Sequence, residues 1–328
     1  MQQEMKYIYT VYQKGSFSKA ARALYMTQPA LSIAVQRVER EIGMPLFRRD
    51  HQPLELTEAG KVYIAKIQEI QFLEHQLEQQ LGDLSQLKTG CLRIGGTHYF
   101  NSYVLPPVLA EYQRHWPGIQ VELTEAGSGE LISLLKENLI DLTFNCTPDP
   151  RDSCHRIPAF RDQVLIAVPV DFPVSGSLSA CAMTAEDILN GIHRTEAVPA
   201  VSAADLAEIP FLLLTSGNNL YERAMSIFRD AGVSPRVRMQ VTQLVTAYHL
   251  CCAGIGAAFI SDRLVTVPDS RVRFYRLNSP LASRLFDIVT PGKTYVSHAQ
   301  KAFVQLFAEY YRSTISLSST ADTPSSPR

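Results

Sequence analysis

The 328-residue sequence has no long apolar run, no cysteine spacing typical of a metal site, and a net charge of only −1. No stretch reaches the roughly 18 apolar residues of a membrane span, and the N-terminal segment lacks the features of a signal peptide. We therefore expect a cytoplasmic protein that has no membrane partner. The six cysteines form no C-x-x-C pair, which favours reduced, mostly buried thiols. With 31 Lys+Arg against 32 Asp+Glu, the composition excludes a protein that coats nucleic acid indiscriminately.

Catalytic motifs are also absent. The sequence has no Walker loop and no HExxH, and residues 126–130 (AGSGE) do not form a G-x-S-x-G nucleophile elbow. Residues 254–259 (GIGAAF) resemble the start of a dinucleotide fingerprint, but they lack its third glycine and follow a predicted helix. The eight histidines show no metal-ligand pair. These absences predict a protein that is not an enzyme and has neither a cofactor nor a metal.

The first sixty residues carry three predicted helices. One runs from Met5 to Gly15, and Ser18 suits the N-cap of a small-residue helix that ends at Leu24. A third helix begins after Thr27 and tolerates Pro29 in its first turn. Its apolar stripe is Leu31, Val35, Val38 and Ile42. The side chains that point away from this stripe are Pro29, Ile33, Gln36, Arg37 and Arg40, with Gln28 and Ser32 on the flank.

The exposed side of this third helix suits a DNA major groove. Amides and hydroxyls can read base edges there, and an apolar group such as Ile33 can contact a thymine methyl. Residues 46–56 (LFRRDHQPLEL) then read as two short strands around a polar tip, which is a hairpin wing. Its Arg48, Arg49 and His51 could reach phosphates or the minor groove.

Together these residues resemble the winged helix-turn-helix signature of LysR-type transcriptional regulators. The matching pieces are residues 15–21 (GSFSKAA), 28–32 (QPALS), 38–39 (VE), Gly43, 46–49 (LFRR) and 56–60 (LTEAG). Ile33 departs from the family, many of whose members have a polar or basic residue there. The predicted DNA-binding residues are Ser16, Ser18, Thr27, Gln28, Pro29, Ser32, Ile33, Gln36, Arg37, Arg48, Arg49 and His51. Two alternatives are that these are merely solvated side chains and that Arg49 pairs with Asp50 or Glu39.

Residues 57–87 predict one long helix with a narrow apolar stripe. Such a helix would be roughly 45 Å long, too long to hide its stripe on a small domain, so we expect it to pair with a second copy. The predicted dimerisation residues are Tyr63, Ile67, Ile70, Leu77, Leu81 and Leu84. The resemblance implies a homodimer, with homotetramers common in the family. The alternative is packing along the chain's own C-terminal domain.

From about residue 89 the pattern changes to alternating strands and helices, which predicts a mostly parallel sheet. Pieces such as residues 92–95 (LRIG) and 253–258 (AGIGAA) resemble the LysR-type effector domain, which is similar to two-lobed periplasmic binding proteins. The predicted fold class is therefore α/β: a winged helix-turn-helix over 1–57, a linker helix over 58–88 and a two-lobed effector domain over 89–312. Lobe 1 would comprise about 91–164 and 268–312, and lobe 2 about 165–267. We expect an insertion of unknown role at 174–200 to lie on the surface, and a disordered tail at 313–328.

Ligands of open α/β sheets bind beyond the carboxyl ends of strands. This rule singles out polar residues that follow the predicted strands and predicts a cleft for a small polar or anionic effector. The predicted effector-binding residues are Thr97, His98, Tyr99, Asn101, Ser128, Asn145, Thr147, Thr215 and Asn218. The alternative for each is turn or cap chemistry, and Tyr99 could be a core aromatic.

The near-zero net charge conceals a division. Residues 14–49 contain seven basic and two acidic residues, whereas residues 50–87 contain two basic and seven acidic ones. The charge division therefore predicts a local basic surface that binds duplex DNA. The resemblance implies that this DNA is a promoter, that a small effector regulates the protein, and that an activator would also contact RNA polymerase. The alternative is a small-molecule-binding protein whose winged helix contacts other proteins.

Overall fold

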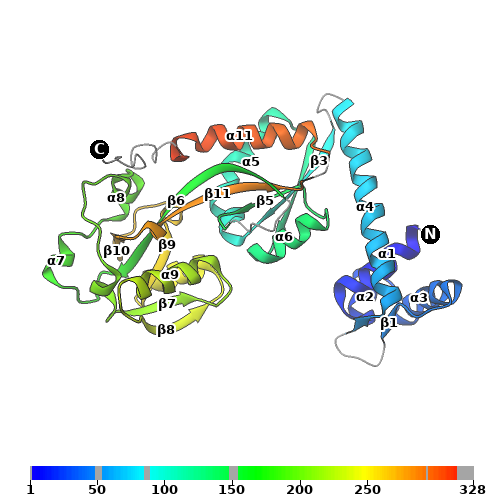
Figure 1. Ribbon diagram of the computed structural model, residues 1–328, viewed down its shortest axis with the longest axis horizontal. Coiled ribbons are helices and arrows are strands. Elements are labelled where there is room, and N and C mark those ends of the chain that lie inside the picture. Colours follow the sequence, from blue (N-terminus) through cyan, green and yellow to red (C-terminus); the bar gives the residue numbers. More distant parts are fainter. Residues whose placement is uncertain (1, 49–53, 85–88, 148–153, 293–294, 316–328) are drawn as a thin grey trace, which may run out of the picture. The chain divides into compact units, whose positions relative to one another are not determined.

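The computed structural model describes residues 2–48, 54–84, 89–147, 154–292 and 295–315 (Figure 1). The chain divides into two compact units, residues 1–80 with 137–139 and residues 81–136 with 140–328. Within the described ranges, no helix is long and apolar enough to cross a bilayer.

The first unit is a winged helix-turn-helix. Its elements are α1 (Gln2–Lys14), α2 (Phe17–Ala23), α3 (Gln28–Ile42), β1 (Phe47–Arg48), β2 (Glu55–Leu56) and most of α4 (Glu58–Leu84). The stripe of α3 is buried at Leu31, Val35 and Val38, and it packs with Ile8 and Val11 of α1. β1 and β2 pair antiparallel as the predicted wing.

The start of α2 differs from the prediction. Ser16, not Ser18, is the N-cap: its backbone is extended and its side chain accepts a hydrogen bond from the Lys19 amide. An N-cap needs this extended geometry, and Ser18 already lies inside the helix. Thr27 caps α3 as predicted, since its hydroxyl accepts from the Ala30 amide.

The wing is fixed to the helices through side chains of the signature. A Glu39 carboxylate oxygen accepts the Leu46 amide at 2.8 Å, and the Thr57 hydroxyl donates to the Pro45 carbonyl at 2.6 Å. Gly60, in the first turn of α4, lies so close to the wing that a Cβ would fall 2.1 Å from the Leu46 carbonyl oxygen. A larger residue at this position would force α4 away from the wing.

The second unit is a two-lobed α/β structure. Its main elements are β3 (Gly90–Gly96), η1 (Phe100–Val104), α5 (Leu105–His115), β4 (Ile119–Glu125), α6 (Ser128–Lys136), β5 (Leu142–Asn145), β6 (His155–Pro169), β7 (Pro210–Leu214), α9 (Asn219–Asp230), β8 (Arg236–Val241), α10 (Leu244–Cys252), β9 (Ala257–Ser261), β10 (Val272–Arg276), β11 (Ser283–Thr290) and α11 (His298–Ile315).

Two long strands, β6 and β11, join the lobes. The strand order is β4-β3-β5-β11-β6-β9-β7-β8, with β10 also paired to β6. Pairs inside each lobe are parallel, as predicted, whereas β6 and β11 pair antiparallel with each other and with β9 and β5. The predicted parallel sheet is therefore interrupted where the lobes meet. Figure 1 shows β6 and β11 running from one lobe to the other.

Several predicted boundaries were wrong. The apolar residues 164–169 predict a strand that begins at Val164, but β6 begins nine residues earlier, at His155, because its first half pairs with β11. The sequence pattern predicts one helix over residues 102–115, where the structure has a π-helical turn, η1, that begins at Phe100 and is followed by α5. α11 was not predicted; Tyr311 donates from α11 to the Val104 carbonyl at 2.8 Å. Since α11 continues to Ile315, the predicted tail starts too early, and its remainder, 316–328, lies outside the described residues.

The 174–200 segment is not a loose surface insertion. It contains α7 (Gly176–Ser179), α8 (Ala185–Leu189) and η2 (Ile192–Arg194). Leu178, Met183 and Ile188 are buried in the core of the second unit, and Met183 forms a β-bridge with Phe274. The few apolar residues of this segment supply the contacts that hold it.

Candidate nucleic-acid interface and ligand cleft

One face of α3 is exposed and carries a mixed polar and apolar surface. Gln28, Pro29, Gln36 and Arg37 are exposed, and Ile33 is 61% exposed. An isoleucine in water among hydrogen-bonding side chains contributes nothing to the core. Arg37 lies 3.2 Å from Glu41, but this pair is exposed and holds the guanidinium only weakly. The face can therefore offer donors, acceptors and one apolar contact to a groove.

The other predicted DNA-binding residues differ in exposure and in the role they have in the fold. Ser32 is half-buried beside this face, Ser18 is exposed on α2, and Arg48 is exposed on β1. Ser16 and Thr27 serve as helix caps. Arg49 and His51 lie outside the described residues.

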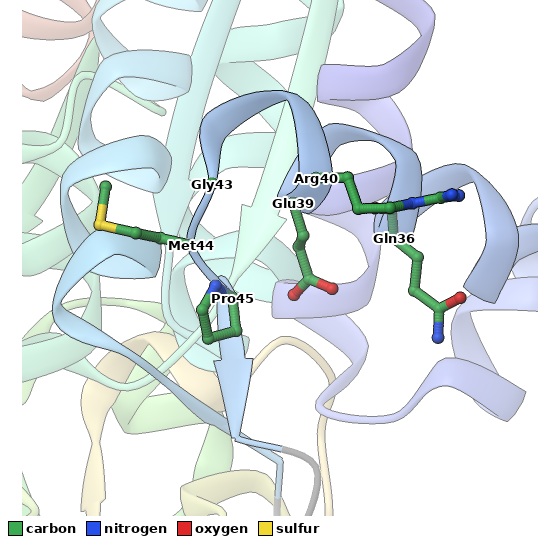
Figure 2. Close-up of a pocket in the computed structure, with 6 residues that line it drawn as sticks. All are labelled: Gln36, Glu39, Arg40, Gly43, Met44 and Pro45. Carbon is green, nitrogen blue, oxygen red and sulfur yellow. The ribbon is translucent and has the colours of Figure 1, made fainter.

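A pocket of about 470 Å³ lies at the far end of α3, away from Gln28 (Figure 2). Gln36, Glu39, Arg40, Gly43, Met44 and Pro45 line it. Its carboxylate, from Glu39, already accepts the Leu46 and Phe47 amides of the wing. Glu39, one of the two charged residues at this pocket, is thus used to hold the fold.

α4 presents an exposed apolar stripe, but the stripe is shorter than predicted. Leu77, Leu81 and Leu84 are 56%, 57% and 81% exposed, with Ile70 and Leu73 also exposed. Ile67 is only 2% exposed and belongs to the core of the first unit, against which Tyr63 also packs. Ile67 is therefore not available for a dimer seam, because the winged domain already covers the N-terminal end of the helix, where Tyr63 is half-buried.

Two adjoining cavities lie between the lobes, with volumes of about 70 and 390 Å³. Residues from both lobes line them. The shared lining residues are Thr97, Ser128, Asn218 and Gln243. The smaller cavity also reaches Arg284 and Phe286 on the joining strand β11. Closing or opening the lobes would therefore change this space.

Three helices begin at these cavities. Ser128 is the first residue of α6, Asn218 is the N-cap of α9, and Gln243 is the N-cap of α10. Unpaired amides and the helix dipole make such N-termini favourable for anions. The Asn218 side chain accepts the Leu220 amide, whereas the Gln243 side chain makes no capping hydrogen bond. Gln243 can therefore turn its amide toward a ligand.

A buried ion pair lies at the base of the smaller cavity. Arg284, whose side chain is 5% exposed, donates from Nε to Asp162 Oδ1 at 2.8 Å and from Nη2 to Asp162 Oδ2. Asp162 Oδ2 also accepts from the Tyr99 and Ser261 hydroxyls, at 2.9 and 2.7 Å. Arg284 Nη1 has no hydrogen-bond partner within the described ranges. The base of the cavity therefore carries a guanidinium with one nitrogen to spare.

The electrostatics of this cluster follow from burial and from Asp162. Burial opposes the charge of Arg284, but the Asp162 carboxylate outweighs it and raises the guanidinium's pKa. Burial and the same carboxylate raise the pKa of Tyr99 well above its usual value, which keeps its hydroxyl a donor. At Cys146, burial raises the pKa of the thiol while the charges of Arg284 and Arg223 lower it. Burial prevails, so the pKa of the Cys146 thiol is raised overall.

A second buried carboxylate, Asp262, directly follows Ser261 in the chain. Asp262 Oδ2 lies 2.9 Å from His193 Nε2 and 2.6 Å from Arg194 Nη2. Burial disfavours the charged form of Asp262, but the His193 hydrogen bond and the Arg194 charge prevail and lower its pKa to about 2. This cluster ties η2 of the 174–200 segment to the end of β9.

The Asp262 cluster predicts an acid-sensitive contribution to stability. A carboxyl whose pKa is lowered on folding stabilises the fold above its unfolded pKa of about 4, and this contribution of about 2 kcal/mol disappears as the pH falls through about 2. The free energy of unfolding of Asp262→Asn should therefore lie well below that of the wild type at pH 6, with the gap narrowing toward pH 2. Urea titrations across this range measure the gap. A gap that stays constant with pH would contradict the assignment.

The structure gathers most of the predicted effector residues but not all. Thr97, His98, Tyr99, Ser128, Asn145, Thr215 and Asn218 line the cavities. Asn101 and Thr147 do not, because Asn101 faces Gly96 and Thr147 accepts a hydrogen bond from Asn219. Tyr99 fits both the prediction and its alternative, because it is a buried core aromatic and also lines the smaller cavity. Asn219, which the sequence also places in the polar ring after a predicted strand, lines the smaller cavity. The sequence reasoning missed Arg284, Gln243 and Cys146; of these, only Gln243 had a signal, its position just before the helix predicted over residues 244–253.

Comparison with known families identifies the two parts. Residues 2–61 match the family described as bacterial regulatory helix-turn-helix protein, lysR family. Residues 85–312 match the LysR substrate binding domain. The chain belongs to the LysR family. This LysR-family protein is a transcriptional regulator, with a DNA-binding domain followed by an effector-binding domain.

Relatives of this LysR-family chain match most of its length. It is 22% identical over 309 residues to the uncharacterized HTH-type transcriptional regulator YybE of Bacillus subtilis, covering 94% of this chain and 98% of that protein. It is 27% identical to the RuBisCO operon transcriptional regulator of Allochromatium vinosum, with 79% and 78% covered. Full-length CbnR, solved in complex with its target DNA, has a similar fold, with a TM-score of 0.63 and 19% identity over 96% of this chain and 99% of that one.

Proposed function

We propose that α3 enters the major groove of promoter DNA and reads base edges through Gln28, Ser32, Ile33 and Gln36. The observation that carries this proposal is the exposed, 61% accessible Ile33 among hydrogen-bonding side chains. Arg37 and Arg48 would hold the phosphates on either side. The regulator would act by binding and not by catalysis, in the cytoplasm where promoter DNA lies, and as an activator it would also contact RNA polymerase.

We propose further that two copies pair through α4. The exposed stripe of Ile70, Leu73, Leu77, Leu81 and Leu84 has the spacing of a two-helix seam. A homodimer covers this apolar surface and doubles the DNA footprint, so the operator would consist of two half-sites related by a dyad. Tetramers would form from two such dimers.

The effector is proposed to be a small carboxylate or similar anion held between the lobes. Three helix N-termini and the spare nitrogen of Arg284 point to a negative ligand, and the hydroxyls of Thr97 and Thr215 to a hydrogen-bonding one. Binding would favour one spacing of the lobes and so shift the balance of assemblies on DNA. Thermal-shift comparison of small carboxylates with their neutral amides tests this: equal stabilisation by the amides would contradict it.

A salt titration tests the DNA-binding proposal. The probe is a labelled duplex that carries the region upstream of this protein's own gene, compared with a scrambled duplex of the same length. Phosphate contacts predict that log K falls steeply and linearly with log[salt]. A flat dependence, or equal affinity for both duplexes at every salt concentration, would contradict sequence-specific binding.

Gln28→Ala and Arg48→Ala should separate base reading from phosphate contact. We expect Gln28→Ala to lose about 1–3 kcal/mol of binding to the specific duplex and almost nothing on the scrambled one, because only base contacts depend on sequence. Arg48→Ala should weaken both duplexes alike and reduce the salt slope by about one. Fluorescence anisotropy measures both. If Gln28→Ala keeps the wild-type preference, α3 does not read bases through this residue.

A further inference from the structure

The turn between α2 and α3 holds a tyrosine in an unfavourable conformation. Tyr25 has φ of +54°, a region that crowds the Cβ of any L-residue and favours glycine. Within the described ranges, Asn138 is the other non-glycine residue with positive φ, and asparagine tolerates this region far better than an aromatic residue does. The backbone at Tyr25 is therefore strained by its own side chain.

The Tyr25 side chain makes no contact within the described residues that would offset this strain. Tyr25 is 98% exposed, and in the described part of the chain its hydroxyl and ring have no partner. Backbone bonds alone close the turn: the Met26 amide donates to the Ala21 carbonyl at 3.0 Å, and the Tyr25 amide donates to the Arg22 carbonyl at 3.2 Å. This is the helix-ending motif in which glycine is the preferred residue at the position of Tyr25. Stability would thus be served better by glycine.

The position of Tyr25 suggests what the side chain does. It lies two residues before Thr27, the N-cap of α3, next to the end of the helix that carries Gln28. The exposed cations Lys19 and Arg22, three residues apart on one face of α2, have no acidic partner among the described residues. A phenol beside such cations is a neutral hydrogen-bond donor for a DNA phosphate, and tyrosine is among the residues that commonly make this contact.

We infer that the Tyr25 hydroxyl donates a hydrogen bond to a backbone phosphate oxygen of the duplex at the edge of the groove that α3 enters. The inference rests on the proposed docking of α3. A neutral donor releases no counterion, so this contact strengthens binding to every sequence without adding to the salt slope. Tyr25 thus positions the start of α3, whereas the side chains of α3 read the bases.

Two variants of the full-length chain test the inference on the specific and scrambled duplexes described above. Tyr25→Phe keeps the ring and removes the donor, and we expect about threefold to tenfold weaker binding to both duplexes with an unchanged salt slope. Tyr25→Gly should weaken binding at least as much, while its Tm equals or exceeds that of the wild type because the backbone strain is relieved. Loss of affinity in a variant that folds as well as the wild type is a result that misfolding cannot produce.

Each other outcome overturns the inference in a recognisable way. Wild-type affinity in both variants would show that Tyr25 does not touch DNA. Weakening in Tyr25→Gly alone would assign the contact to the ring and not to the hydroxyl. A reduced salt slope in Tyr25→Phe would contradict a neutral contact. If the wild-type protein showed no salt-dependent binding to either duplex, the proposed docking of α3 on DNA would be contradicted. The inference about Tyr25 would then fall with it.

Discussion

Arg284→Met is expected to lower the free energy of unfolding by about 3–5 kcal/mol. The reason is Asp162, which is fully buried and receives two hydrogen bonds from the Arg284 guanidinium. Without Arg284 the carboxylate keeps only the Tyr99 and Ser261 hydroxyls, and a buried charge without its counter-charge is costly. Chemical unfolding monitored by circular dichroism measures the loss.

A double variant provides the control for this prediction. Asp162→Asn combined with Arg284→Met removes both charges and should recover most of the lost stability, because the cost comes from the unpaired carboxylate. If Arg284→Met alone costs less than about 1 kcal/mol, the pair contributes little to holding the strands that join the lobes. If the double variant is as unstable as the single one, the cost comes from lost packing and not from charge.

Leu77→Glu is expected to convert the protein from dimers into monomers. Leu77 is 56% exposed in the single chain, so a glutamate there should leave the fold of the protomer intact. In the proposed seam each dimer would bury two such carboxylates against leucine side chains without a partner, at a cost of several kcal/mol. Light scattering coupled to size-exclusion chromatography measures the mass.

Ala65→Glu is the matched control on the same helix. Ala65 is exposed and lies about 120° around the helix from Leu77, at 100° per residue. This variant introduces the same side chain outside the stripe and should remain dimeric. Dimers in both variants would place the dimer contact elsewhere. Monomers in both would point to a general effect of charge on α4.

The winged domain could be predicted closely because its signals are local. The period of Leu31, Val35 and Val38 identified the buried side of α3, and so the exposed side that carries Ile33. Thr27 signalled the helix start through chemistry within three residues. The N-cap of α2 was misplaced by two residues because Ser16 and Ser18 offer the same hydroxyl, and only backbone geometry distinguishes them.

The α4 stripe was predicted too long for a related reason. Periodicity marks which side chains share a face but not what covers them. Ile67 and Leu77 both fit the pattern, yet the winged domain covers the first and leaves the second exposed. Similarly, the sparse apolar residues of 174–200 gave no pattern, although Met183 and Ile188 enter the core.

The sequence by itself determined the order of the parts, the exposed face of α3 and the ring of polar residues after the strands, because each depends on neighbours a few positions apart. Only the tertiary structure decided that Arg284 of β11 and Asp162 of β6 meet beneath Thr97 and Asn218. It also showed that Tyr25 is strained and unpartnered. The physical reason is that strand pairing and packing bring distant residues together, and neither backbone strain nor exposure can be read from residue spacing.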